Sequence, residues 1–175
     1  MVTFEHGEPV REWSQLLWAD GVDWNDANVK KAFEINQIDP ASLRGQPTFE
    51  QVLPDLLLEL SSDVWVAHNA EYDMRMLNSE LKRLGRPALS PQLTVCTKNL
   101  ASHFNETTEG NRLTQVAPRW GVTMDSAHRA TVDARACGQV LAAMLRGGRL
   151  PREDAAMAAL CAKAEAAWKG KHRWA

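Results

Sequence analysis

Residues 64–73 read V-W-V-A-H-N-A-E-Y-D, and this stretch decides which kind of fold the sequence predicts. The apolar run at 64–67 is typical of a short buried strand. Two strongly polar residues, His68 and Asn69, follow at once, and Asp73 falls within the first turn of a predicted helix. Ligand sites in open α/β sheets form at the carboxyl ends of strands, so Asp73 is a candidate site residue. An acid at a helix start also suits the helix dipole, which is the simpler interpretation.

The rest of the chain alternates predicted strands with predicted helices, which indicates an α/β layered domain. Each helix is expected from apolar residues at helical spacing, and turn residues separate the elements. Asp26 or Asn25 is expected to cap the first helix and Thr48 the second. We predict strands at 2–4, 10–17, 64–67 and 93–96, and helices at 25–33, 48–60, 72–84, 113–120, 130–145 and from 151 onward, with a polar loop at 100–109.

Composition sets limits on the function without identifying it. The chain has 175 residues, of which 45% are hydrophobic and 24% charged, as expected for one globular domain. The formal charge of -2 argues only against diffuse electrostatic binding to nucleic acid. No stretch resembles a membrane span or a signal peptide. Three separated cysteines favour free thiols in a reducing cytoplasm over a structural zinc site.

A second polar motif lies near the C-terminal end of the pattern. Residues 126–134 read S-A-H-R-A-T-V-D-A, with His128 and Asp133 five positions apart. An acid on an alanine-rich helix face is unfavourable unless it is paired or bound to a metal. The alternative interpretation is a solvated acid on the outer face of the helix, with His128 an ordinary loop residue.

Together the two segments resemble the second and third motifs of the DEDDh 3′-5′ exonucleases. Residues 68–73 are similar to the family pattern H-N-x-x-[FY]-D, and residues 128–134 to H-x-A-x-x-D-A. This superfamily includes the proofreading epsilon subunit of bacterial DNA polymerase III, ribonuclease T and oligoribonuclease. The resemblance covers residues 1–146 and implies a ribonuclease H-like exonuclease fold, a mixed sheet flanked by helices. Residues 147–175 would form a separate C-terminal helix and basic tail.

The resemblance also implies a chemistry and a set of site residues. In this family four carboxylates hold two divalent ions, Mg²⁺ or Mn²⁺, which activate the attacking water and stabilise the leaving 3′ oxygen. Asp73 and Asp133 would be two of the four ligands, and His128 would be the general base. The residues expected on the substrate side are His68, Asn69 and Tyr72. The implied substrate is the 3′ end of single-stranded DNA or RNA, with a DNA polymerase or a second copy of the chain as a possible partner.

One motif of the family is missing from this sequence. The family carries D-x-E on its first strand, in the middle of the sheet, and no such strand is present here. Residues 2–10 look instead like the family's second and third strands with their hairpin turn. Two carboxylates alone are expected to hold Mg²⁺ weakly, so activity should be absent or reduced.

Three explanations of this departure stay open. The chain would be an incomplete version of a longer protein, a short form completed by a partner, or a non-catalytic binding module of exonuclease fold. The first predicts an apolar strand ending in D-x-E, encoded in frame upstream of Met1. A hydrolase of another type, with Cys96 or a serine as nucleophile, has no supporting motif.

Overall fold

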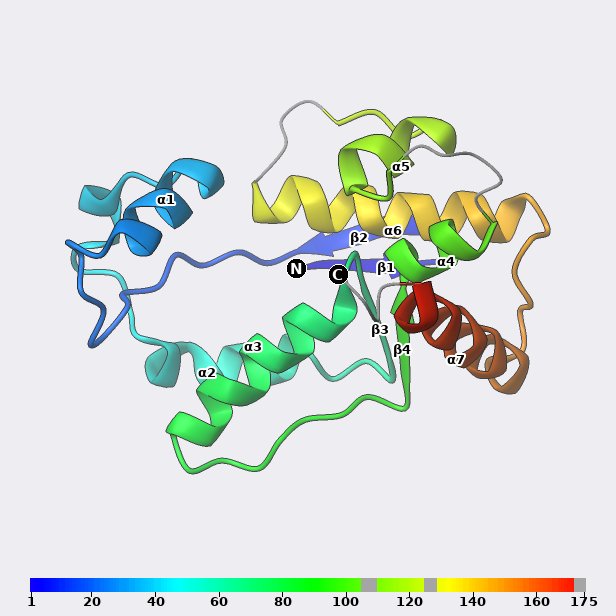
Figure 1. Cartoon of the computed structure of the whole chain (residues 1–175). Coiled ribbons are helices and arrows are strands. Elements are labelled where there is room, and N and C mark those ends of the chain that lie inside the picture. The colour runs from blue at the N-terminus through cyan, green and yellow to red at the C-terminus, as the bar shows by residue number, and fades with distance from the viewer. Residues whose placement is uncertain (105–109, 125–128, 172–175) are drawn as a thin grey trace.

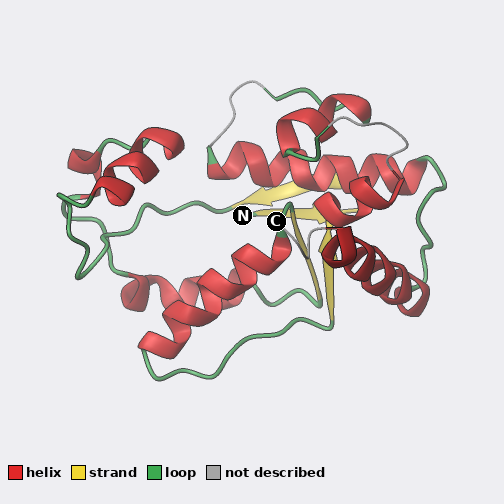
Figure 2. Cartoon of the chain, viewed as in Figure 1, coloured by secondary structure: helices red, strands yellow, loops and turns green. Residues whose placement is uncertain are grey.

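The computed structural model of the chain describes residues 1–104, 110–124 and 129–171, and its helices and strands confirm the predicted α/β class (Figure 2). The chain alternates short strands with helices that cover them. The strands are β1 (Val2–Glu5), β2 (Glu8–Glu12), β3 (Val64–Ala67) and β4 (Leu93–Cys96). The helices are α1 (Ala27–Asn36), the 3-10 turn η1 (Pro40–Leu43), α2 (Phe49–Glu59), α3 (Ala70–Arg83), α4 (Thr97–Phe104), α5 (Leu113–Arg119), α6 (Ala130–Arg146) and α7 (Asp154–Lys171).

The strands form two separate pairs in the described part of the chain. β1 and β2 are an antiparallel hairpin, whereas β3 and β4 are parallel, with Val64 opposite Leu93 and Ala67 opposite Cys96. Helix α6 packs against β1, β2 and β3, so one helix covers both pairs (Figure 1). The strands described here thus form two small sheets, one antiparallel and one parallel, instead of one continuous mixed sheet, and the two share a covering helix.

The strand predicted over 10–17 is shorter in the structure. β2 ends at Glu12, and the last contact with the neighbouring strand joins the Met1 ammonium to the Trp13 carbonyl oxygen at 2.6 Å. Residues 14–17 are not assigned to a strand in the structure, and a strand persists only while its backbone groups are paired. A turn is expected at residues 6–9, and the structure narrows it to His6 and Gly7, which both have positive φ, because Glu8 and Pro9 already pair with β1.

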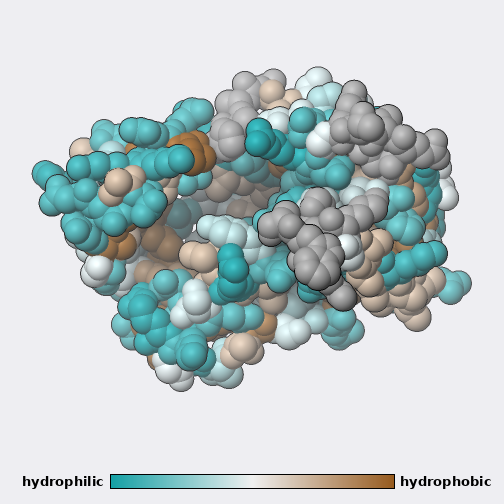
Figure 3. Space-filling model, in the orientation of Figure 1, coloured by the Kyte–Doolittle hydropathy of each residue, from teal (hydrophilic) through white to brown (hydrophobic). Residues whose placement is uncertain are grey.

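A small lobe formed by α1 and η1 lies beside the main body (Figure 1). Its centre is a stack of three aromatic rings, in which Trp24 lies 5.1 Å from Trp18 and 5.4 Å from Phe33 between ring centroids. Asp26 caps α1 by accepting from two backbone N–H groups, as predicted. The surface of this lobe is mostly hydrophilic, teal in Figure 3, and small brown hydrophobic patches show mainly beside the hollow next to it.

The main core lies at the other side of the molecule. It is built from β4, α4, α5, α6 and α7, and its fully buried members include Leu100, Val140 and Met144. No residue of the β1–β2 hairpin is buried. The accessible surface is 11571 Å², about a third more than the roughly 8500 Å² that size scaling gives for a compact chain of this mass. Within the described residues every helix is too short or too polar to span a lipid bilayer.

Two local predictions have opposite outcomes. Thr48 caps α2 in a capping box with Gln51, as its sequence position indicated. The loop predicted at 100–109 is wrong for residues 100–104, which belong to α4, and residues 105–109 lie outside the described part. Leu100 and Ala101 are buried on the inner face of α4, so tertiary packing stabilises this helix. The polar residues on its outer face made the segment look like a loop in the sequence.

Gly138 lets the exposed hairpin pack against α6. A methyl group at this position would overlap the ring of Phe4 on β1. Although alanine is the better helix former by about 1 kcal/mol, we expect Gly138→Ala to lower the free energy of unfolding by roughly 1–3 kcal/mol through overpacking. Urea denaturation measures the change. Gly170→Ala on α7, where the added methyl meets nothing, is the matched control and should be neutral or slightly stabilising. Equal stability of the two variants would contradict this packing.

Candidate active site

The candidate site forms where the parallel strands β3 and β4 end side by side. His68 directly follows β3, and Thr97, the first residue of α4, directly follows β4. The His68 Nδ1 atom lies 3.0 Å from the Thr97 hydroxyl, and His68 Nε2 lies 2.8 Å from the carbonyl oxygen of Asn111. Thr97 is completely buried and also lies 3.3 Å from the Cys137 sulfur of α6. These contacts connect both strand ends, α6 and the segment before α5.

The hydrogen bonds of His68 assign its tautomer. A carbonyl oxygen only accepts, so Nε2 carries the proton that is donated to Asn111. Burial lowers the pKa of His68, so the ring is neutral at pH 7 and Nδ1 accepts from the Thr97 hydroxyl. Both ring nitrogens are thus bonded within the protein. His68 holds the strand ends in place, and its ring edges are occupied by protein partners.

Helix α3 presents the second predicted site residue, Asp73, in its first turn. Asn69 precedes the helix in a left-handed conformation with φ of 96°, which makes the turn from β3 into α3 sharp. Asp73 is exposed by surface area, yet neighbouring atoms remove enough water to raise the pKa of its carboxyl group. Tyr72 points outward, half exposed, with the Arg75 guanidinium 5.6 Å from its ring centroid.

Helix α6 brings Asp133, in its first turn, to the same region. Cys137 lies one turn further along α6, and burial raises the pKa of its thiol to about 12, with the charges of Asp73 and Asp133 adding to the rise. Asp133 also acts electrostatically on His68. Asp73 and Asp133 thus lie on separate helices and both act electrostatically on the Cys137 thiol. That they share one metal site stays a prediction. His128 lies outside the described residues. Cys137 stays protonated and is unsuited to act as a nucleophile.

The carboxylates of Asp73 and Asp133 are suitable ligands for a divalent cation, but they are only two of the four that the family uses. The described ranges contain no group of three or more histidine, cysteine or acidic side chains arranged to hold a metal. Hard ions such as Mg²⁺ and Mn²⁺ prefer oxygen ligands, which Asp73 and Asp133 supply. Because the pKa of Asp73 is raised, its ionised form is disfavoured in the metal-free protein, and a nearby cation would stabilise that form. The residues present therefore suit a weakly held ion.

The comparison with protein families decides the classification. The model of the RNase T family, described as an exonuclease, matches residues 25–141, which is more than half of the chain. The chain belongs to this exonuclease family. The matched range includes every predicted site residue, among them Asp73, Asp133 and His128. The resemblance and the ribonuclease H-like fold class inferred from the two motifs are thereby confirmed.

Relatives of this exonuclease-family chain include DNA polymerase III proteins. A DNA polymerase III subunit epsilon of Treponema pallidum is 29% identical over 145 residues, which is 82% of this chain and 65% of that protein. The subunit epsilon of Aquifex aeolicus is 30% identical over 64% of this chain and 55% of its own length. A PolC-type DNA polymerase III of Clostridium perfringens is 31% identical over 63% of this chain and 8% of its own length. The chain thus matches less than two thirds of each of these relatives.

Sequence reasoning missed three residues of this exonuclease-family site. Thr97 could have been found, because it follows β4 in the same way that His68 follows its parallel neighbour. Asn111 and Cys137 carry no comparable signal, since their contacts with the site depend on how α5 and α6 pack.

Removing the Thr97 hydroxyl should weaken the hydrogen bonding that holds His68 in place. We expect Thr97→Val to lower the free energy of unfolding by roughly 1–3 kcal/mol, because the buried Nδ1 atom loses its donor. Thr97→Ser keeps the hydroxyl and is the control, with a smaller loss. Urea denaturation at pH 7 measures both variants. If serine and valine lowered stability equally, the hydroxyl would have no special role.

Proposed function

We propose that this chain is the core of a 3′-5′ exonuclease, which hydrolyses phosphodiester bonds and releases nucleotides from a nucleic-acid 3′ end. The observation that carries the proposal is that Asp73 and Asp133, in the first turns of α3 and α6, both act electrostatically on Cys137, whose sulfur contacts Thr97 at the end of β4. Membership of the exonuclease family supports the reaction type.

The chain's own residues take distinct roles in this proposal. Asp73 and Asp133 would hold divalent metal, Mg²⁺ or Mn²⁺, which would supply water activation and charge neutralisation. His128 is the general base and removes a proton from the attacking water. Neutral His68 fixes the shape of the turn through Thr97. Asn69 and exposed Tyr72 face the terminal nucleotide.

The number of carboxylates limits the activity that this chain would have alone. Two acids provide half of the charge that four would place around the metal, and Mg²⁺ gives up its waters reluctantly. We therefore expect weak or undetectable hydrolysis with Mg²⁺ unless further carboxylates are supplied. A D-x-E strand, in the same chain or from a partner, would supply them next to β3.

Substrate and partner follow from the relatives. Subunit epsilon and PolC-type relatives are named as parts of DNA polymerase III, so we propose a single-stranded DNA or RNA 3′ end as substrate and a DNA polymerase as partner. Self-association is a second arrangement open to the chain. Three free cysteines suit a reducing cytoplasm.

A non-catalytic binding module is the second candidate. The observation in its favour is that no group of three metal ligands exists in the part of the chain that the structure describes. Such a module would bind nucleic acid or a polymerase through the same fold without hydrolysis.

A strand labelled at one end separates the two candidates. The chain is incubated with Mn²⁺ and single-stranded oligonucleotides labelled at the 3′ or the 5′ end, together with the Asp133→Asn variant as control. Loss of the 3′ label before any shortening from the 5′ end, absent in the variant, supports the exonuclease. Loss of label that is equal in the variant would contradict it.

A further inference from the structure

Lys98 places a positive charge at the rim of the candidate site. It follows Thr97 at the start of α4, and its ammonium lies 3.3 Å from the Asn69 Oδ1 atom. The charge of Lys98 contributes to lowering the pKa of His68, so it lies within electrostatic reach of the site. No acidic side chain among the described residues forms an ion pair with Lys98. The side chain is half-buried and its charge is not neutralised there.

The indole ring of Trp168 on α7 lies against this ammonium. The Lys98 nitrogen lies 4.7 Å from the centroid of the indole ring, a cation–π distance. Next to Trp168, Lys169 lies 3.8 Å from the Glu71 carboxylate at the start of α3. The C-terminal part of α7 is therefore attached to the rim by two contacts, while the rest of the helix packs against β4 and α4.

The contact with Lys98 also orients the Asn69 amide. Because the ammonium only donates, the Asn69 oxygen faces Lys98 and the amide nitrogen faces away from it. An ammonium carries three N–H donors, and the Asn69 oxygen accepts one of them. The indole face stabilises the charge without accepting a conventional hydrogen bond. Within the described residues, donors of both Lys98 and Asn69 thus stay available to a negatively charged ligand.

We propose that Lys98 binds a phosphate of the nucleic-acid strand at the rim of the site, and that Trp168 and Asn69 hold its ammonium in place. The proposal rests on the exonuclease function proposed above and adds a positioning residue to it. It gives α7 a defined part in substrate binding. The net charge of -2 does not attract phosphate, so binding of a strand depends on cations placed locally at the site, such as Lys98.

A purely structural lysine would give a different result in one measurement. If Lys98 only stabilised the left-handed Asn69, its loss would change stability and leave the salt dependence of strand binding unaltered. Phosphate contacts release counterions, so each one adds about 0.7 to the slope of log affinity against log salt for a single strand. The slope therefore separates a phosphate contact from a structural role.

The experiment measures binding of a fluorescent single-stranded oligonucleotide by anisotropy, with EDTA present to prevent hydrolysis, across a range of salt concentrations. Lys98→Gln should weaken binding about three- to tenfold at low salt and reduce the slope by roughly 0.7. Lys98→Arg keeps the charge and should retain the slope. Trp168→Ala should weaken binding less than Lys98→Gln, and Trp168→Phe less again.

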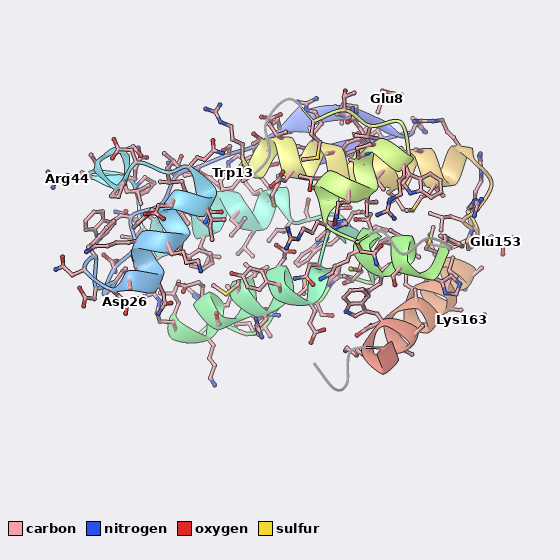
Figure 4. The ribbon with its side chains drawn as sticks, turned by 45° about the horizontal axis from the view of Figure 1, so that its top comes forward. Glu8, Trp13, Asp26, Arg44, Glu153 and Lys163 are labelled. Atoms are coloured by element: carbon pink, nitrogen blue, oxygen red, sulfur yellow. The ribbon has the colours of Figure 1, made fainter. Side chains whose placement is uncertain are left out.

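Lys163→Gln is the matched charge control. Lys163 is exposed on the same helix (Figure 4), five residues before Trp168 and so about 140° around the helix axis. Its loss should leave affinity and slope almost unchanged. Thermal unfolding of each variant checks folding, and Lys98→Arg keeps the test valid if Lys98→Gln is unstable.

Three outcomes would overturn the proposal: an unchanged slope in Lys98→Gln, an equal change in Lys163→Gln, or no strand binding by the unaltered chain. Failure of the proposed function is a separate result. Strand binding that depends on Lys98, without Mn²⁺-dependent hydrolysis in any form of the chain, would support the phosphate contact and contradict the exonuclease.

Discussion

Appending an apolar strand that ends in D-x-E to the N-terminus, through a short flexible turn, is expected to raise Mn²⁺-dependent hydrolysis on the order of a hundredfold or more. The added acids would join Asp73 and Asp133 and complete a four-carboxylate ligand set. The structure offers a place for the strand, because β1 and β3 lie under the same helix α6 and each pairs with only one neighbour in the described chain. Release of nucleotides from a labelled strand measures the gain.

An appended N-x-Q strand is the control for this experiment. It fills the same backbone position without adding charge, so both additions should raise the free energy of unfolding by pairing exposed strand edges. Only the D-x-E version should gain activity. Equal activity of the D-x-E and N-x-Q versions would show that carboxylate number does not limit this chain.

In the extended chain, Asp73→Asn and Asp133→Asn should each reduce hydrolysis about a hundredfold or more, and the double variant should be no worse. Residues that hold the same ion act as a unit, so their losses do not add. Arg135→Gln is the control and should keep most of the activity, because Arg135 lies two residues after Asp133, about 200° around the axis of α6, and pairs with Glu12. Single-turnover kinetics with Mn²⁺ compares them. Additive losses would mean that the two acids serve different sites.

Stability provides an independent readout for Asp73. Burial raises the pKa of its carboxyl group, so the ionised form is disfavoured in the folded state relative to the unfolded chain. This penalty is fully present above the raised pKa and disappears as the pH falls below about 3.9, the ordinary value. Asp73→Asn should therefore slightly stabilise the metal-free chain at pH 7 while it removes metal binding. The gain is small because the side chain is partly exposed.

The sequence predicted the two parallel strands and two helix caps most accurately. β3 and β4 have the predicted bounds, and Asp26 and Thr48 form the predicted caps. These features depend on a few neighbouring residues, such as an apolar run followed by polar side chains. The same local pattern made Asp73 a candidate and residues 126–134 made Asp133 one, and the roles of both acids stay predictions.

Features that depend on distant packing were not predicted. α4 was taken for a loop because its buried side chains are separated by polar ones such as Asn99 and His103. The roles of Thr97 and Cys137 follow from how α4 and α6 meet, which no local pattern encodes. The contact between Lys98 and Trp168 joins residues 70 positions apart and became visible only in the folded chain.

Metal binding tests the central claim most directly, because it needs neither a substrate nor added residues. Mn²⁺ is titrated into the unaltered chain, Asp73→Asn, Asp133→Asn and the double variant, and binding is followed by electron paramagnetic resonance of free Mn²⁺. We predict weak binding by the unaltered chain and the same near-complete loss in all three variants. Unchanged Mn²⁺ binding in either single variant would contradict a site shared by Asp73 and Asp133.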